Sequence, residues 1–203
     1  MQIELLEIDG AFVATPTVHG DDRGHFAETF RADLFSEATG HPFTLAQANT
    51  SLSARGVVRG VHFALVPPGQ AKYVSCLAGT IVDYVIDVRV GSPTFGTYTT
   101  VELDGSARRA VYLSEGLGHA FCVLSESATV SYYCSTPYSP TREFGVNPLD
   151  PDLALSWPTG LELLFSPKDS AAPSLAQARE RGELPDYEQC RTYIEGLRTS
   201  GAS

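Results

Sequence analysis

The chain is patterned as a series of short runs rich in β-branched and aromatic residues, separated by turns that contain glycine, proline and serine. The runs recur about every ten residues, and most of them follow one another without a helical segment between them. Many short strands at this spacing predict an all-β fold, an antiparallel sandwich or barrel. The predicted strands cover residues 11–18, 43–52, 57–66, 71–79, 80–90, 97–104, 109–115, 119–125 and 128–136.

The run IVDYVIDVRV, residues 81–90, alternates between two kinds of side chain. Val82, Tyr84, Ile86 and Val88 are apolar, and successive residues of a strand point to opposite faces of the sheet. The other face is mixed, because it carries Asp83, Val85, Asp87 and Arg89. A mixed inner face is expected of a barrel that holds a polar site.

Helices are few in the predicted structure. The segment RADLFSEATG, residues 31–40, is typical of a helix that stops at Gly40. The end of the chain predicts two short helices, of which the first ends at Gly182 and the second follows Pro185-Asp186. We therefore expect one domain over residues 1–170 and a helical tail over residues 171–203 that packs on the same domain.

Composition and charge narrow the possible partners. The chain has 203 residues, of which 43% are hydrophobic, and a formal net charge of −10. Nucleic acid and anionic membranes attract basic surfaces, so neither is an expected partner, and an anionic ligand would need basic groups placed locally. Four cysteines without CxxC spacing predict buried free thiols in a reducing cytosol. Without a signal segment or an apolar run of ~20 residues, we expect a soluble, cytoplasmic protein.

The five histidines fall into two groups. His19, His25 and His41 stand in polar, turn-like surroundings and are expected at the surface. His62 and His119 stand in apolar runs, where a histidine is either a satisfied core residue or a general base that titrates near neutral pH. No His-x-His pair occurs, since Ala64 stands two residues after His62, and we predict no metal site.

Three other positions are candidates for chemistry. Lys72 is one of only two lysines, and a lysine beside Tyr73 and Val74 is costly to bury without a partner or a role. Arg59 precedes His62 by three residues, so the two point to opposite faces of a strand unless a bulge intervenes. In TVSYYCS, either Tyr132 or Tyr133 must face inward, and a phenol can act as an acid.

Five motifs in order resemble those of the dTDP-4-keto-6-deoxy-sugar epimerases, the dTDP-4-dehydrorhamnose 3,5-epimerase family and its relatives from antibiotic-sugar pathways. The resemblance covers roughly residues 10–170. It rests on DDRGHFAETF, QANTSLSARGVVRGVHF, QAKYVSCLAGTIVDYVIDVRVGSPTFG, YLSEGLGHAFCVLSE and YSPTREFGVNPLDPDLALSWP, followed by SPKD.

The resemblance implies a cupin-like jelly-roll barrel, usually a homodimer, that binds a dTDP-4-keto-6-deoxy sugar without a metal or other cofactor. It implies that His62 is the catalytic base, oriented by Asp169, that Tyr132 is the acid, and that Lys72 lies beside the keto oxygen. Tyr138 matches an aromatic residue that stacks on thymine. The positions that match substrate-binding residues are Arg23, Phe26, Glu28, Gln47, Asn49, Arg59, His119, Tyr138, Glu143 and Lys168.

The sequence also departs from the family pattern. Ala64 stands where many relatives carry glutamine, and the chain continues about 30 residues past Asp169. Both features resemble the antibiotic-sugar relatives, of which some invert only C3 or only C5, and the sequence leaves that choice open. The alternatives are a sugar-nucleotide 3,4-ketoisomerase, a metal-dependent cupin oxygenase and a non-catalytic sugar-nucleotide-binding barrel.

Overall fold

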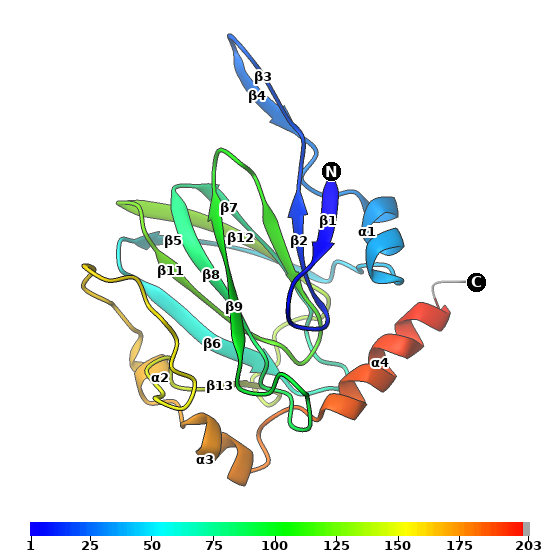
Figure 1. Ribbon diagram of the computed structural model, residues 1–203, viewed down its shortest axis with the longest axis vertical. Coiled ribbons are helices and arrows are strands. Elements are labelled where there is room, and N and C mark those ends of the chain that lie inside the picture. Colours follow the sequence, from blue (N-terminus) through cyan, green and yellow to red (C-terminus); the bar gives the residue numbers. More distant parts are fainter. Residues whose placement is uncertain (201–203) are drawn as a thin grey trace.

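Two facing antiparallel β-sheets form the body of the protein in a computed structural model that describes residues 1–200 (Figure 1). The six-stranded sheet has the order β1 (Gln2–Leu5), β2 (Ala11–Thr15), β10 (Ala110–Leu113), β7 (Lys72–Ala78), β12 (Ser127–Cys134) and β5 (Gln47–Ala54). The five-stranded sheet has the order β13 (Glu143–Gly145), β6 (Val58–Ala64), β11 (Gly118–Val123), β8 (Thr80–Ile86) and β9 (Tyr98–Asp104). A separate hairpin consists of β3 (Val18–Asp21) and β4 (Gly24–Ala27).

The antiparallel all-β fold is confirmed, in the form of an open jelly-roll sandwich. Every strand pair of the three sheets is antiparallel. Over residues 1–200 no strand ladder joins the six-stranded to the five-stranded sheet, so the sheets do not close into a barrel. The main core lies between the two sheets, where Val74 and Val130 of one sheet belong to the same buried cluster as Val85 and Phe121 of the other.

The alternation in residues 81–90 is explained by burial on both faces of β8. Tyr84 and Ile86 pack with Leu153 and Leu175 on the outside of the five-stranded sheet. Val85 faces the core between the sheets, and Asp83 is also completely buried. A buried aspartate on a strand needs a polar partner, which the candidate site below provides.

A short helix packs beside the β1 edge of the six-stranded sheet. Helix α1 (Ala32–Thr39) ends at Gly40, whose φ of 80° is the left-handed conformation expected of a glycine stop. The helix places Phe35 edge-on to the ring of Tyr112, with a centroid distance of 4.8 Å. The surface position expected for His41 is wrong, because the turn after α1 folds its ring onto Phe35 and leaves it 5% exposed.

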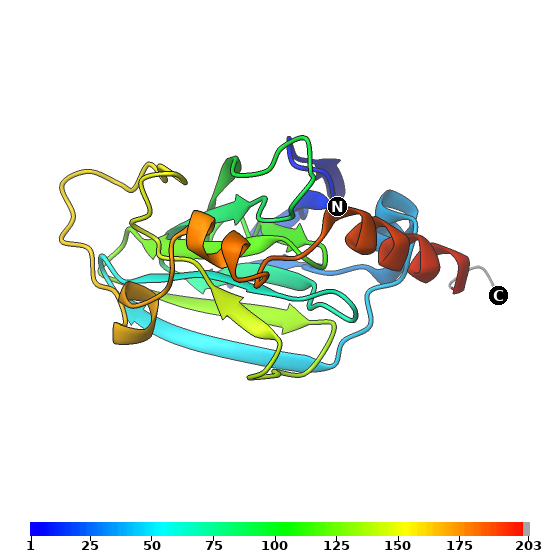
Figure 2. The same cartoon turned by 90° about the horizontal axis from the view of Figure 1, so that it is seen from below.

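The end of the chain forms three helices: α2 (Pro167–Ser170), α3 (Leu175–Glu180) and α4 (Tyr187–Ser200). The two predicted helices correspond to α3 and α4, whereas α2 was not predicted. Figure 2 shows α4 at one end of the sandwich, beside α1, where Arg198 approaches Gly40. Residues 201–203, the end of the predicted tail, lie outside the described residues. None of the described helices is long and apolar enough to cross a membrane.

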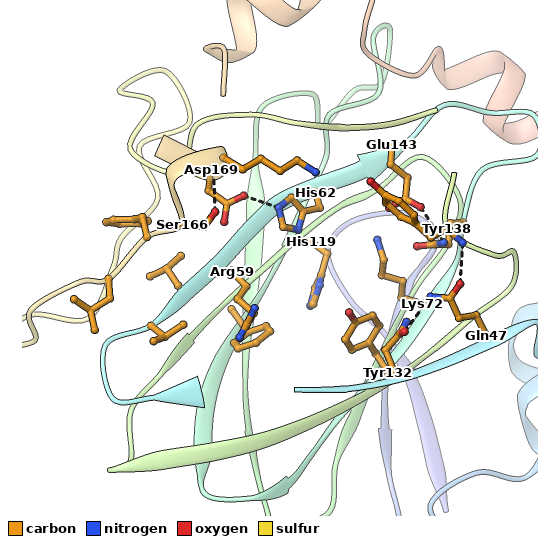
Figure 3. Close-up of a pocket in the computed structure, with 18 residues that line it drawn as sticks. Gln47, Arg59, His62, Lys72, His119, Tyr132, Tyr138, Glu143, Ser166 and Asp169 are labelled. Atoms are coloured by element: carbon orange, nitrogen blue, oxygen red, sulfur yellow. Dashed lines mark hydrogen bonds and ion pairs between the residues drawn. The ribbon is translucent and has the colours of Figure 1, made fainter. Parts of the chain in front are cut away.

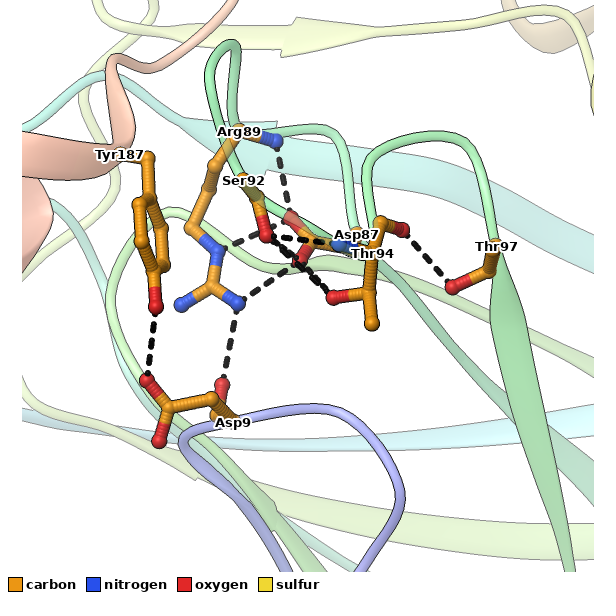
Figure 4. A network of polar contacts seen from close by, with 7 residues as sticks. All are labelled: Asp9, Asp87, Arg89, Ser92, Thr94, Thr97 and Tyr187. Atoms are coloured by element: carbon orange, nitrogen blue, oxygen red, sulfur yellow. Dashed lines mark hydrogen bonds and ion pairs between the residues drawn. The ribbon is translucent and has the colours of Figure 1, made fainter.

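Buried polar groups hold the start of α4 against the sheets. Arg89 and Asp87 are both completely buried and form an ion pair with an N–O distance of 2.9 Å (Figure 4). The guanidinium also donates to the carbonyl of Asp9 at 3.0 Å and lies over the ring of Tyr187. The four cysteines are buried free thiols, as predicted.

Candidate active site

A pocket of about 520 Å³ opens between the two sheets (Figure 3). This volume lies within the ordinary range for small-molecule sites. Side chains from both sheets and from the segment before α3 line it. The pocket brings together eleven of the residues predicted from the sequence: Gln47, Asn49, Arg59, His62, Lys72, His119, Tyr132, Tyr138, Glu143, Lys168 and Asp169.

An irregularity in β6 turns both Arg59 and His62 into the pocket. His119 pairs with His62 and Phe121 pairs with Arg59, so three steps along β6 match two steps along β11. The extra residue is a bulge, the condition under which the two side chains share a face. Gly60 in the bulge has a φ of 122°, and a Cβ there would lie 2.5 Å from the carbonyl oxygen of His119. This position therefore requires glycine.

The His62 ring contacts the buried carboxylate of Asp169, with 2.7 Å between Nε2 and Oδ1. Burial, the largest single cause, disfavours the charged carboxylate, but the hydrogen bond and charge of His62, together with Ser166 and Lys168, hold the pKa of Asp169 below its usual range. Because Nε2 faces Asp169, Nδ1 is the nitrogen left to face the pocket. A histidine backed by a carboxylate in this way is held in one orientation and can accept a proton.

Local sequence explains how a residue so far along the chain reaches His62. Ser166 caps α2, since its Oγ accepts a hydrogen bond from the backbone N–H of Asp169 at 3.0 Å, and Pro167 begins the helix. Just before α2, the chain bonds to the turn between β5 and β6 through Leu164 N–H to the Gly56 carbonyl at 2.9 Å. These contacts bring Asp169 against the strand that carries His62.

A second histidine–carboxylate pair lies next to the first. His119 Nε2 is 2.7 Å from Asp83 Oδ2, and the Asp83 side chain is completely buried. His119 is the cross-strand neighbour of His62, so two imidazoles line one wall of the pocket. The sequence indicated His119 but not its partner. An aspartate at a buried position of β8 was the available signal.

Tyr132 faces the pocket from the opposite sheet. Figure 3 shows its ring and the His62 ring on opposite sides of the pocket. Tyr133 points to the outer face and is 36% exposed, so the side chain predicted to face inward is that of Tyr132. Burial, the largest cause, raises the pKa of the Tyr132 phenol above its ordinary value. The phenol is therefore protonated at neutral pH and can donate.

Lys72 lies on the same side of the pocket as Tyr132, at the start of β7. It is 6% exposed, so the position is inside the sandwich and not on an edge strand. Burial lowers the pKa of its ammonium group, whereas the neighbouring Cys134 and Glu143 act in the opposite direction. Next to it, Gln47 accepts from the backbone N–H of Tyr138 at 2.8 Å and donates to Asn49 at 2.9 Å.

The three remaining predicted residues do not line this pocket. Arg23, Phe26 and Glu28 belong to the β3–β4 hairpin and the segment directly after it, and Figure 1 shows the hairpin projecting from the body of the molecule. The Arg23 side chain is 90% exposed and Phe26 is 65% exposed.

The pocket also contains residues that were not predicted: Val57, Val58, Gln70, Phe121, Leu164, Phe165 and Ser166. Most are apolar and come from segments whose sequence looks like ordinary core or loop. Only Gln70, a polar residue two positions before the buried start of β7, offered a signal. Among residues 1–200 no group of three or more histidine, cysteine or acidic side chains is arranged to hold a metal ion.

Taken together, the jelly-roll sandwich and its pocket define the class of protein: one with an acid–base site for a small molecule. A carboxylate-backed imidazole lies on one wall, a protonated phenol on the other and an ammonium group beside the phenol. Such an arrangement can move protons at both faces of a bound molecule and stabilise charge on its oxygen.

Comparison with known proteins identifies the family. The family model for dTDP-4-dehydrorhamnose 3,5-epimerase matches residues 5–177. A dTDP-4-dehydrorhamnose 3-epimerase of Streptomyces niveus is 53% identical over 94% of this chain and 92% of its own. A dTDP-4-dehydrorhamnose 3,5-epimerase of Mycolicibacterium smegmatis is 52% identical over 95% of both chains. The protein belongs to this family, whose members are isomerases.

A solved structure agrees in fold. A 3'-monoepimerase from Streptomyces bikiniensis, determined in complex with dTDP-quinovose, superimposes with a TM-score of 0.94 and 46% identity over 97% of this chain and 99% of that chain. The relatives include an enzyme named for C3 alone and one named for C3 and C5, at 53% and 52% identity. Overall similarity therefore does not decide which carbon is inverted.

Proposed function

We propose that the protein epimerises a dTDP-4-keto-6-deoxyhexose at C3, C5 or both, in the biosynthesis of a deoxysugar of the antibiotic type. The observation that carries the proposal is the carboxylate-backed His62 ring opposite the Tyr132 phenol. A C–H bond beside a ketone is acidic only because the enolate spreads its charge onto oxygen. Inversion removes that proton from one face of the sugar and returns one to the other face, so it needs groups on two opposite walls.

Each group has a place in this reaction. His62, held by Asp169, takes the proton, and Tyr132 delivers one to the opposite face. Lys72 stabilises the enolate oxygen, since a compact ammonium suits a single oxyanion. Arg59 and Lys168 supply local positive charge for the diphosphate in a chain whose net charge is −10. The ketone itself provides the electronic activation, so the proposal requires no cofactor.

A homodimer is the second part of the proposal. On strands β5, β7 and β12, the outer face of the six-stranded sheet presents uncharged side chains, among them Leu52, Leu77 and Tyr133, which are 71%, 42% and 36% exposed. An uncharged sheet face with exposed leucines suits a second copy of the chain. The projecting β3–β4 hairpin would then carry Arg23 and Phe26 to the partner's pocket.

The tail and the cellular location complete the proposal. We infer that residues 171–200 of the predicted tail are part of a single domain with residues 1–170, supported by the contacts of Tyr187 with Asp9 and Arg89. We also infer a cytoplasmic location, supported by four buried cysteines that remain free thiols.

Solvent exchange tests the reaction directly. A dTDP-4-keto-6-deoxyhexose is incubated with the protein in D₂O, and NMR locates the deuterium and identifies the product. The expected result is label at C3, C5 or both with an unshifted carbonyl, whereas a product with its carbonyl at C3 would show a ketoisomerase. Binding of dTDP without any deuterium uptake would reject catalysis.

The variant His62→Asn links the reaction to the site. It should reduce exchange at every labelled carbon by ~10²-fold or more, because positioned acid–base catalysis is commonly worth ~10²–10⁴-fold. Binding of dTDP, measured by calorimetry, should be largely kept. An exchange rate within about tenfold of the wild-type rate would remove His62 as the base.

A further inference from the structure

The Lys72 side chain is buried at the pocket wall, and its ammonium group has no direct partner among the described residues. Within the described part of the chain, no hydrogen bond from its Nζ and no carboxylate within ion-pair distance is found, although the residue is only 6% exposed. Figure 3 shows its side chain extending from β7 toward the wall that carries Glu143. A buried ammonium group tends to lose its proton, because burial penalises the charged form.

Glu143, on β13, is a carboxylate of the same pocket that also lacks an ion pair. Its carboxylate accepts from the backbone N–H of Ser139 at 3.0 Å and from Gln70 at 3.4 Å, so it is held in place by neutral donors. Over residues 1–200 it forms no ion pair, in contrast to Asp169, which has His62, and Asp83, which has His119. Among the described residues that line the pocket, Glu143 is thus the carboxylate without an ion pair, and Lys72 and Lys168 are the ammonium groups without one.

We propose that Glu143 is a positioning residue whose carboxylate keeps Lys72 protonated and directed into the pocket. The proposal deepens the proposed function and rests on it for the role of Lys72, since only a charged lysine stabilises an enolate oxygen strongly. An indirect counter-charge suits this task better than a close ion pair. A carboxylate in contact with Lys72 would compete with the substrate oxygen for the same protons.

The other ionisable groups around Lys72 do not provide this charge. Burial, the largest cause, raises the pKa of the Cys134 thiol, so this cross-strand neighbour of Lys72 is neutral. The same holds for Tyr132. The other pocket side chains that can carry positive charge are Arg59, His62, His119 and Lys168, and the one other carboxylate, Asp169, is already paired with His62.

The composition of the chain makes the test direct. Lys72 and Lys168 are the only lysines, so protein labelled with ¹³C at lysine Cε gives two side-chain signals. We expect Glu143→Gln to lower the midpoint of the Lys72 titration by about one pH unit, the lower end of the effect of a nearby opposite charge. Glu143→Asp should lower it less, and the Lys168 signal should keep its midpoint.

A matched control separates the local effect from the overall charge. Glu126→Gln removes one negative charge at an exposed position and should leave the Lys72 midpoint unchanged. An unchanged Lys72 midpoint in Glu143→Gln, or an equal shift in Glu126→Gln, would overturn the proposal. If Glu143→Gln fails to fold by circular dichroism, the Glu143→Asp titration and its comparison with wild type decide in the same way.

Solvent exchange then connects the coupling to catalysis. In Glu143→Gln, the fall of the exchange rate at alkaline pH should begin at a lower pH than in the wild type. In a Lys72→Arg background the cation does not titrate, so the same substitution should leave this part of the pH profile unchanged. A rise in KM without this change in the pH profile would assign Glu143 to substrate binding alone. The titrations use no substrate, so an absence of all exchange would reject the proposed function and leave the Lys72–Glu143 coupling to its own test.

Discussion

At the scale of single residues, the pocket separates two adjacent tyrosines by strand geometry alone. Tyr132 lines the pocket and Tyr133 lies on the outer face, because neighbouring strand residues point in opposite directions. This pair gives a test in which the two halves of the reaction come apart.

The expected result for Tyr132→Phe is exchange without inversion. His62 should still form the enolate and return a proton to the original face, so deuterium enters the substrate while net inversion falls by ~10²-fold or more. NMR of the sugar product in D₂O measures both quantities at once. Tyr133→Phe is the control and should change neither rate appreciably.

Two results would contradict this assignment. Equal losses of exchange and inversion in Tyr132→Phe would mean that the phenol is needed for enolate formation itself. The uncoupled behaviour in Tyr133→Phe would mean that the outward-facing residue is the acid.

At the scale of secondary-structure elements, the connection between α4 and the sheets depends on a fully buried ion pair. Asp87 accepts from Arg89, from Ser92 at 2.6 Å and from Thr94 at 2.7 Å, so its carboxylate is completely satisfied (Figure 4). The ring of Tyr187, the first residue of α4, covers the guanidinium. A buried charge that loses its partner is strongly destabilising.

Replacing Arg89 should therefore destabilise the protein far more than changing Tyr187. We expect Arg89→Met to lower the free energy of unfolding by about 3–5 kcal/mol, since it leaves the Asp87 carboxylate uncompensated. Tyr187→Phe removes only the exposed 3.3 Å hydrogen bond to Asp9 and should cost about 1 kcal/mol or less. Urea unfolding measures the free energy of unfolding of both variants. Equal decreases in the two variants would contradict a special contribution of the Arg89–Asp87 ion pair.

At the scale of the whole molecule, the β3–β4 hairpin is the main feature that one copy of the chain leaves unexplained. Its strands pair only with each other, and the residues predicted to bind substrate there are exposed and remote from the pocket. In the proposed dimer the pocket of one subunit and the hairpin of the other form one site.

Coexpression of two inactive variants tests this arrangement. One variant carries Arg23→Ala with Phe26→Ala, and the other carries His62→Asn. If the hairpin serves the partner's pocket, random mixed dimers restore about a quarter of the wild-type sites, because half of the dimers are mixed and each has one intact site.

The matched control pairs His62→Asn with Asp169→Asn. Both changes lie in the same pocket, so their mixed dimers contain no intact site and no activity should return. Light scattering gives the oligomeric state, and a monomer, or a mixture with no recovery in the hairpin experiment, would contradict the proposed dimer.

Much of the architecture could be predicted because it depends on local patterns. Period-two alternation and turn residues predicted the strands, Gly40 predicted the end of α1, and Gly182 and Pro185 separated α3 from α4. These signals are read within a few residues of where they act. The assembly of the pocket was predicted through the resemblance of ordered motifs, and eleven of those residues do meet in it.

The tertiary structure alone decided the remaining features, because they depend on residues far apart in the chain. The bulge at Gly60 that turns Arg59 and His62 to one face exists only in the pairing of β6 with β11. Asp83 gained its partner His119, and His41 became buried, through packing between separate elements. Long-range packing also decides that the two sheets do not close into a barrel and that the β3–β4 hairpin lies away from the pocket of its own chain.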